Sequence, residues 1–423
     1  MLYPVQDWFK TRLQPPYLRL IAGAVVLMGL TLAIVSWATS NRGTSAVDIP
    51  WGADFAGFYV AAQILDQGDA SKLYDRDLHA RLYHELLPNL PKDEIIPYVH
   101  PPFVAGALRV LTFFSYDTAA AIWLVISMGL YVAGVLLILK TCPLLDQQHR
   151  WLVVLLAVSF EPFLFETWLG GQLSAVAFFS YALAWYCYRR GWPIYAGLAL
   201  GICFYKPTLL ILILPMLLLA RQWKVLLGMT VTGFLLLGAS LLMVGWKCTV
   251  SYLDVLLAFR KATAGQEEMV IRTWKYVDLN HFYLQQLGPS NWKAIAFIVS
   301  VVLCVGLLLV SRWWRCSKHA ENQEVTWACT LFLVPLINVY VGVYDSILTV
   351  QAAIIVTEVL MKRLNGRLFT TSWPYYLLML ALMPWFSQPV AKSVGLQLFT
   401  VVLLICAIYA ARATEWRNMN SRG

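Results

Sequence analysis

One carboxylate, Asp54, stands in a long polar loop directly after the first membrane-length apolar run of the chain. Its neighbours in residues 51–59 are aromatic or small, so it lies at the expected edge of a bilayer. A carboxylate in that position can act as a general base. An aspartate at the start of an apolar stretch can also cap the helix that follows it. We interpret Asp54 as a base and keep helix capping as the alternative.

More polar and aromatic residues fall in loops that we expect on the same membrane face as Asp54. They offer a cation, amides, imidazoles and phenols, which suit a sugar carried on a lipid phosphate. We expect Lys206, Gln172 and His100 at the donor phosphate. The residues that we expect at the acceptor or the sugar are Tyr59, Glu166, Asn280, His281, Tyr344 and Asp345.

Each of these residues also has a purely structural interpretation. Lys206 could lie at the interface and extend its charge toward water. Asp345 could cap the helix that follows it. The two histidines could be hydrogen-bonded interface residues, Glu166 could be solvated, and Gly171-Gln172 could be a tight turn. The aromatic residues near Asp54 could form an interfacial belt.

The composition places the chain among integral membrane proteins. Of its 423 residues, 60% are hydrophobic and 13% are charged, and the mean hydropathy is +0.64. The net charge of +9 does not indicate nucleic-acid binding, because the basic residues lie mainly at the ends of apolar runs. The first run, residues 18–38, is too long for a cleaved secretory signal, so we expect it to remain as a helix.

Twelve apolar runs predict an all-α polytopic protein with about 12 transmembrane helices. Basic residues such as Arg150, Arg189, Arg315 and Lys362 flank alternate runs. By the positive-inside rule, their side and both termini are cytoplasmic, in a cell inner (plasma) membrane. The runs lie at about residues 18–39, 118–140, 151–168, 173–188, 192–205, 207–220, 225–245, 293–311, 325–342, 346–361, 374–388 and 393–411.

Two long loops, about residues 40–117 and 246–292, then lie on the extracytoplasmic face. In the first loop, apolar residues recur every three or four positions in residues 55–65 and 74–86. This spacing predicts two amphipathic helices along the membrane surface, separated at Gly68. Residues 102–114 are too short to span the bilayer and should form an interfacial or re-entrant helix. With no internal repeat, residues 1–423 form one domain.

A series of short motifs resembles glycosyltransferase family 87, the polyprenyl-phosphate-mannose-dependent α-mannosyltransferase-like proteins of the GT-C superfamily. The motifs are Asp54-Phe55, Tyr59-x-Ala61-Ala62, Leu73-Tyr74-Asp75, Pro101-Pro102-Phe103, Gly171-Gln172 and Lys206-Pro207. The resemblance implies a GT-C-type fold, Asp54 as the catalytic base, and a polyprenyl-phosphate sugar as donor to a lipid or glycan acceptor. It implies no nucleotide sugar, no cofactor and no obligatory metal. His100 and Ser174 depart from the family pattern, which leaves the donor sugar open.

Together these features predict an inverting displacement in which Asp54 deprotonates the acceptor and Lys206 stabilises the departing phosphate. Mannose is the first candidate, and arabinose or another polyprenyl-phosphate sugar is the main alternative. A lipid-linked sugar transporter or flippase should show paired repeats and ionisable groups at the bilayer midplane, whereas these polar groups gather at one surface. A membrane scaffold would not need a carboxylate and a lysine in ordered motifs.

Overall fold

The computed structural model describes residues 14–41, 45–46, 51–90, 96–263, 273–316, 320–366 and 368–420. Over these ranges the chain is helical and forms no β-sheet, and an isolated antiparallel β-bridge joins Tyr276 to Gly342. The predicted all-α class is therefore confirmed.

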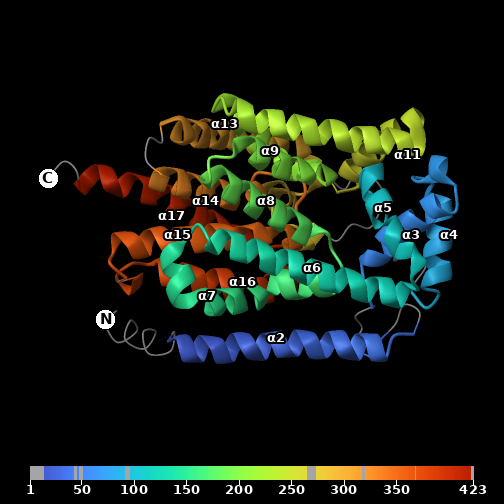
Figure 1. Ribbon diagram of the computed structural model, residues 1–423, viewed down its shortest axis with the longest axis horizontal. Coiled ribbons are helices and arrows are strands. Elements are labelled where there is room, and N and C mark those ends of the chain that lie inside the picture. The colour runs from blue at the N-terminus through green and yellow to red at the C-terminus, as the bar shows by residue number, and fades with distance from the viewer. Residues whose placement is uncertain are drawn as a thin grey trace.

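Long helices run roughly along the longest axis of the molecule, and α3, α4 and α5 lie together at one end of it (Figure 1). The α-helices are α2 (Pro15–Ala38), α3 (Phe55–Asp66), α4 (Arg76–Leu86), α5 (Pro102–Leu108), α6 (Tyr116–Leu139), α7 (Pro143–Val158), α8 (Ser174–Arg189), α9 (Pro193–Gly201), α10 (Ile213–Leu219), α11 (Trp223–Thr263), α12 (Leu279–Leu287), α13 (Trp292–Cys316), α14 (Ala320–Leu336), α15 (Leu348–Arg363), α16 (Trp373–Val394) and α17 (Leu398–Asn420). A π-helix, η3 (Pro162–Leu169), follows α7. Short 3₁₀ segments include η2 (Arg109–Phe113), η4 (Ile202–Tyr205), η5 (Pro207–Leu210), η6 (Thr273–Lys275) and η8 (Val343–Ile347).

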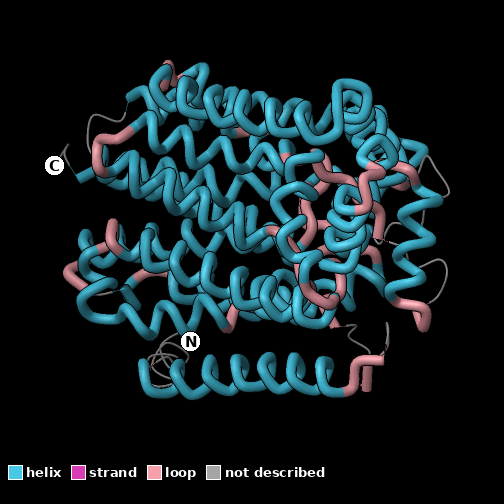
Figure 2. Tube along the Cα trace, turned by 45° about the vertical axis from the view of Figure 1, so that its right-hand side comes forward, coloured by secondary structure: helices cyan, strands magenta, loops and turns pink. Residues whose placement is uncertain are grey.

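The bundle has two chemically different ends. We call the end formed by α3, α4 and α5 the loop end, because irregular segments gather there (Figure 2). At the opposite end, α2 begins and α17 finishes. Arg189 and Lys362, from the ends of α8 and α15, both pair there with Glu324 of α14, at 2.8 and 3.8 Å. We call this the basic end, since residues that flank alternate apolar runs meet there as the sequence predicts.

Within the described residues, five helices are long and apolar enough to cross a membrane, or six if α7 and η3, bent by 56°, form one broken span. These helices fit a multi-pass membrane protein. The other predicted runs coincide with described helices that are shorter or less apolar. The total of 12 spans therefore stays a prediction.

Helix α3 corrects one expectation about the first long loop. Ala56 and Val60 pack against Leu78 of α4, while Phe55 and Tyr59 face the main core on the other side. Because neighbours cover both faces, α3 is buried almost all round and has no broad polar face toward a membrane surface. The expectation of a surface-lying amphipathic helix is wrong for α3.

Helix α4 has the predicted alternation of buried and exposed positions. It begins after Asp75, whose side chain accepts hydrogen bonds from the amides of Asp77 and Leu78 at 3.1 and 3.0 Å. Gly68, with φ +83°, separates α3 from this part of the loop as predicted. The short helix predicted at residues 102–114 is present as α5 and η2.

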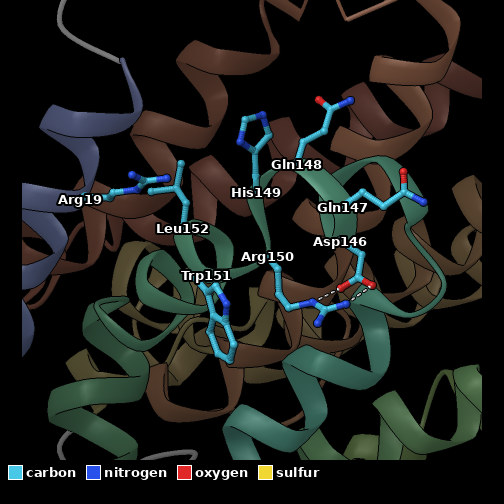
Figure 3. Close-up of a pocket in the computed structure, with 8 residues that line it drawn as sticks. All are labelled: Arg19, Asp146, Gln147, Gln148, His149, Arg150, Trp151 and Leu152. Atoms are coloured by element: carbon cyan, nitrogen blue, oxygen red, sulfur yellow. Dashed lines mark hydrogen bonds and ion pairs between the residues drawn. The ribbon is translucent and has the colours of Figure 1, made fainter.

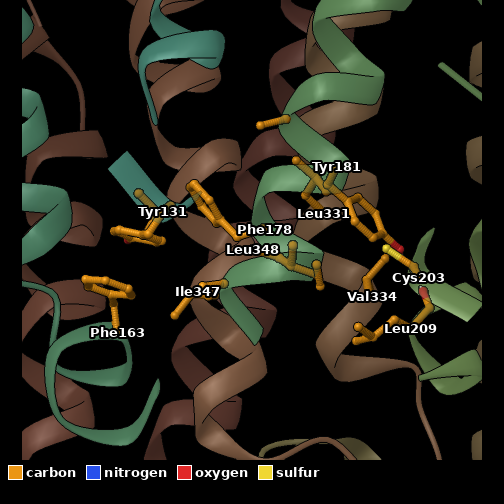
Figure 4. Close-up of a cluster of buried hydrophobic side chains, with 14 of the residues drawn as sticks. Tyr131, Phe163, Phe178, Tyr181, Cys203, Leu209, Leu331, Val334, Ile347 and Leu348 are labelled. Atoms are coloured by element: carbon orange, nitrogen blue, oxygen red, sulfur yellow. Dashed lines mark hydrogen bonds between the residues drawn. The ribbon is translucent and has the colours of Figure 1, made fainter. Parts of the chain in front are cut away.

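Aromatic side chains from α6, η3 and α8 pack together in the buried core (Figure 4). Tyr131 of α6 stacks on Phe163 of η3, with ring centroids 3.5 Å apart, and its ring lies 4.3 Å from that of Phe178. The Tyr181 hydroxyl of α8 donates to the Leu209 carbonyl at 2.7 Å. This hydrogen bond ties the irregular segment η5 to a regular helix.

Candidate functional site

Asp54 follows a strained turn that presses against a second loop. Gly52 and Ala53 have φ values of +75° and +36°, and a positive φ at a residue other than glycine stores strain. The Asp54 amide donates to the Gly170 carbonyl at 3.0 Å. A Cβ atom on Gly171, which has φ +71°, would collide with the Gly52 carbonyl. The close approach of the two loops therefore requires glycine at position 171.

The Asp54 side chain is used differently from a helix cap. Asp54 stands at the N-cap position of α3, but its side chain makes no capping hydrogen bond. Instead, its Oδ2 accepts a hydrogen bond from Nε2 of Gln172. The residue is partly exposed. An amide thus orients a carboxylate that solvent can still reach, and this geometry does not support the capping alternative.

Lys206 is buried and paired. It lies between η4 and η5 with φ −139° and ψ 80°, outside the α region that a following proline disfavours. It is 7% exposed, and its ammonium forms an ion pair with Oδ2 of Asp345, which is 1% exposed. The ammonium also lies over the Tyr344 ring, 4.8 Å from its centroid. The interpretation of Lys206 as a lysine that extends into water at the interface is therefore wrong.

Asp345 is the counter-ion of Lys206. Its Oδ1 accepts a hydrogen bond from the Ser174 hydroxyl at 2.7 Å, so both carboxylate oxygens are engaged. Helix α15 has Ile347 at its N-cap, without a side-chain capping bond. The capping interpretation of Asp345 is wrong as well.

Residues 170–174, which we call the strap, join the two charged groups. Gln172 contacts Asp54, and two positions later Ser174 contacts Asp345. Between them, the Leu173 carbonyl accepts a hydrogen bond from the Tyr205 hydroxyl at 3.2 Å. Since Tyr205 directly precedes Lys206, a shift of the strap would disturb both the carboxylate and the lysine.

His100 lies beside the lysine. Its Nδ1 donates to the Tyr205 carbonyl at 3.1 Å, and its ring meets Phe58 edge to face, with centroids 5.2 Å apart. Burial lowers the pKa of His100 to about 4; the charge of Lys206 acts in the same direction, and the hydrogen bond to Tyr205 opposes it. At neutral pH the imidazole is therefore uncharged and presents Nε2 as an acceptor.

Glu166 and Tyr59 have protein partners of their own. Glu166 of η3 pairs with Lys275 at 3.3 Å and accepts a hydrogen bond from Gln388 at 2.7 Å, so it is not simply solvated. Tyr59 is buried, and its hydroxyl donates to the Phe114 carbonyl at 2.8 Å. The structure therefore places Tyr59 in the core.

The two candidate residues in α12, Asn280 and His281, both have partners within the protein. Asn280 donates to the Val339 carbonyl at 3.1 Å. His281 is fully buried, and its Nδ1 lies 3.0 Å from the Asp278 carboxylate. We see no accessible polar face on His281, whereas the Asn280 side chain is partly exposed.

Asp278 is a residue that sequence reasoning missed. Its carboxylate accepts hydrogen bonds from the amides of His281 and Val341, at 2.9 and 2.8 Å, and it is fully buried. It thereby fixes the segment that leads into η8, which carries Tyr344 and Asp345. An aspartate just before a helical stretch was the available signal, since aspartate is a favoured N-cap. Ser174 was noticed only as a departure from the family pattern.

Across the described residues, no group of three or more His, Cys, Asp or Glu side chains has the arrangement of a metal site. The candidate site consists of one oriented carboxylate, one buried ion pair and an uncharged imidazole, all linked by the strap and Tyr205.

Comparison with known proteins gives one match. No curated protein and no solved structure matches the chain. The profile of glycosyltransferase family 87 matches residues 98–338, a range that holds His100, Gln172 and Lys206 and begins after Asp54. Because this match covers more than half of the 423 residues, the chain belongs to glycosyltransferase family 87.

Proposed function

We propose that this membrane glycosyltransferase moves a sugar from a polyprenyl-phosphate donor to a hydroxyl of a lipid or glycan acceptor. Mannose is the first candidate sugar, the fold is of the GT-C type, and the reaction occurs on the extracytoplasmic face. The observation that carries the proposal is the state of Asp54: a partly exposed carboxylate, oriented by Gln172 and not used as a cap.

The reaction that fits this carboxylate is a single displacement. Asp54 takes the proton of the acceptor hydroxyl while that oxygen bonds to the anomeric carbon of the donor sugar. The bond from that carbon to the phosphate oxygen breaks, and the polyprenyl phosphate leaves with the bonding electrons. One displacement inverts the configuration at the anomeric carbon.

The role of Lys206 follows from its pairing. An ammonium has three N–H donors, and Lys206 directs one of them at Asp345. Because Asp345 offsets much of its charge, Lys206 suits a directed hydrogen bond to the donor phosphate better than a long-range attraction. In the proposed reaction, the uncharged His100 accepts a hydrogen bond, for example from a sugar hydroxyl, and does not neutralise the phosphate.

The test of this function is a donor screen. Purified protein in nanodiscs would receive radiolabelled polyprenyl-phosphate mannose, arabinose or glucose, and the products would be separated and their anomeric configuration determined. We expect transfer from the mannose donor with inversion, and none by Asp54→Asn. Transfer from a nucleotide sugar, with none from any polyprenyl-phosphate sugar, would overturn the proposal.

The proposed orientation has its own test. A cysteine at Asp75, at the loop end, should react with an impermeant thiol reagent added to intact cells, whereas a cysteine at Arg315 should not. Labelling at Arg315 from outside would reverse the orientation.

A further inference from the structure

A cavity of about 340 Å³ opens at the basic end, next to α2 and α7 (Figure 3). It lies at the end of the molecule opposite α3, α4 and α5. Helix α7 is interrupted at His149, which has φ −138° and ψ 15°. The lining residues are Arg19, Asp146, Gln147, Gln148, His149, Arg150, Trp151 and Leu152.

The lining is rich in hydrogen-bond donors and carries a positive charge. Asp146 is its one acid, and Arg150 already pairs with that carboxylate through two contacts of 2.7 Å. Arg19, reaching from α2, has no acidic partner within the described part of the chain. Two glutamine amides and an imidazole add further polar groups. This chemistry fits an anionic group with several acceptor oxygens, such as a phosphate.

Membrane-facing surface borders the cavity. Only 17% of the α2 span is buried inside the protein, so lipid can reach this helix from most directions. Leu20, directly after Arg19, is 71% exposed, and Trp151 is 70% exposed. Tryptophan with an arginine at the end of an apolar helix is typical of the membrane–water interface. An occupant can therefore enter sideways from the bilayer with its apolar part in contact with these side chains.

We propose that this cavity binds the phosphate of an anionic glycerophospholipid, with the acyl chains lying along α2 and α7. Basic pockets between transmembrane helices are known to hold such headgroups. The exposed apolar border favours a lipid over a free anion, because a soluble phosphate would make no use of Leu20 and Trp151. The cavity lies at the end of the bundle opposite Asp54, so lipid binding there does not depend on which sugar donor the enzyme uses.

The test uses the purified full chain in neutral detergent, with lipid binding counted by native mass spectrometry. Dioleoylphosphatidylglycerol and dioleoylphosphatidylcholine are titrated separately, and inorganic phosphate serves as a competitor. We expect one saturable site that prefers phosphatidylglycerol and resists millimolar phosphate. Arg19→Gln should weaken that site about fivefold, the effect of one basic residue near a membrane surface.

The matched control is Arg190→Gln. Arg190 is an exposed arginine at the end of α8, lies over Tyr186 and does not line the cavity. We expect wild-type lipid binding by this variant and unchanged thermal unfolding of both variants without added lipid. Wild-type binding by Arg19→Gln, an equal loss with Arg190→Gln, equal binding of both lipids, or displacement by inorganic phosphate would each overturn the proposal.

Discussion

The two ends of the bundle hold similar charged groups in different ways. At the basic end, both oxygens of Glu358 accept hydrogen bonds from backbone amides, those of Leu144 and Leu145 in the first turn of α7, at 3.1 and 3.0 Å. Lys362 lies one helical turn away, 3.3 Å from the same carboxylate. The Glu358 carboxylate thus stabilises the first turn of α7, where the backbone amides have no partner within the helix.

At the loop end, side chains from irregular segments hold the charged groups. Asp345 is bound by Ser174 and Lys206, and Asp54 by Gln172, while the adjacent backbone contains a strained turn and a π-helix. Such irregular backbone costs free energy and concentrates where function requires it. This difference supports our proposal that the chemistry takes place at the loop end, while the pairing at the basic end is structural.

Removing the carboxylate of Asp54 should have the largest effect. Asp54→Asn keeps the shape of the side chain but cannot accept a proton, so we expect turnover to fall by roughly 10² or more. Initial rates at saturating donor, with membrane insertion checked in parallel, measure this loss. Asparagine is as good an N-cap as aspartate, so a merely structural Asp54 would leave turnover near normal.

Glu358→Gln is the matched change at the basic end. It weakens the hydrogen bonds to α7, and we expect a loss of about 1 kcal/mol of stability with turnover per folded molecule unchanged. A catalytic defect in folded Glu358→Gln would remove the distinction between the two ends.

The ion pair comes next in expected effect. Lys206→Met leaves Asp345 buried without its cation, so we expect a loss of about 3–5 kcal/mol of stability together with impaired donor use. Adding Asp345→Asn removes the unpaired charge and should recover much of the thermal stability. Donor affinity and turnover should not recover in the double variant. Lys206→Arg should retain only part of the wild-type donor affinity and turnover, since a planar guanidinium differs in shape from an ammonium.

Recovery of turnover in the double variant would show that Lys206 serves folding alone. The comparison of thermal midpoints with donor titrations for the single and double variants separates the two roles.

A pair of glycines tests the strap. Gly171 and Gly191 have φ values of +71° and +76°, but a Cβ atom on Gly171 would strike the Gly52 carbonyl, whereas nothing lies within 4 Å of one on Gly191. Gly191→Ala should therefore cost only the backbone penalty, about 1–2 kcal/mol, and leave turnover unchanged. Gly171→Ala should also displace the Asp54 loop and lower turnover roughly tenfold, by misplacing a reacting group. Equal kinetics of the two variants would show that the strap does not position Asp54.

The helices that coincide with apolar runs were predictable from the sequence, whereas α11 continues to Thr263, into residues 246–292 that we expected to form a loop. The burial of α3 was also predictable from the sequence: residues 55–65 are apolar or small except Gln63, and a helix that is apolar nearly all round is buried and does not lie on a surface. The spacing of Phe55, Phe58 and Tyr59 taken alone predicts one apolar face, but Ala56 and Val60 make the opposite face apolar as well.

The candidate site was predictable only in part. The predicted topology places the loops that carry Asp54, Gln172 and Lys206 on the same membrane face, so these residues could be expected near one another. The pairing of Lys206 with Asp345 could not, because 139 positions separate them and no local spacing encodes such a contact. The hydrogen bond of Ser174 to Asp345 was unpredictable for a related reason, since one serine at a helix start has many possible partners.

The smallest expected effect concerns His100 and acid. Its pKa of about 4 in the folded protein lies below the ordinary 6.5, so the unfolded chain binds more protons between these values. His100 therefore contributes stability that is present above pH 6.5 and is lost as the pH falls toward 4. Burial also lowers the pKa of His79, in α4, so His79→Gln is the control for this class of effect.

We expect His100→Gln to lose less stability than the wild type between pH 7 and pH 4.5, when thermal unfolding is followed at each pH. Glutamine can still donate to the Tyr205 carbonyl but does not titrate. In a separate assay of turnover against pH, His100 should cause no inflection at neutral and higher pH, because its imidazole stays uncharged there. A wild-type inflection in turnover near pH 6.5 that disappears in His100→Gln, but not in His79→Gln, would mean that His100 is solvated and titrates normally. The loop end would then be more open than the packing of His100 against Phe58 and Tyr205 implies.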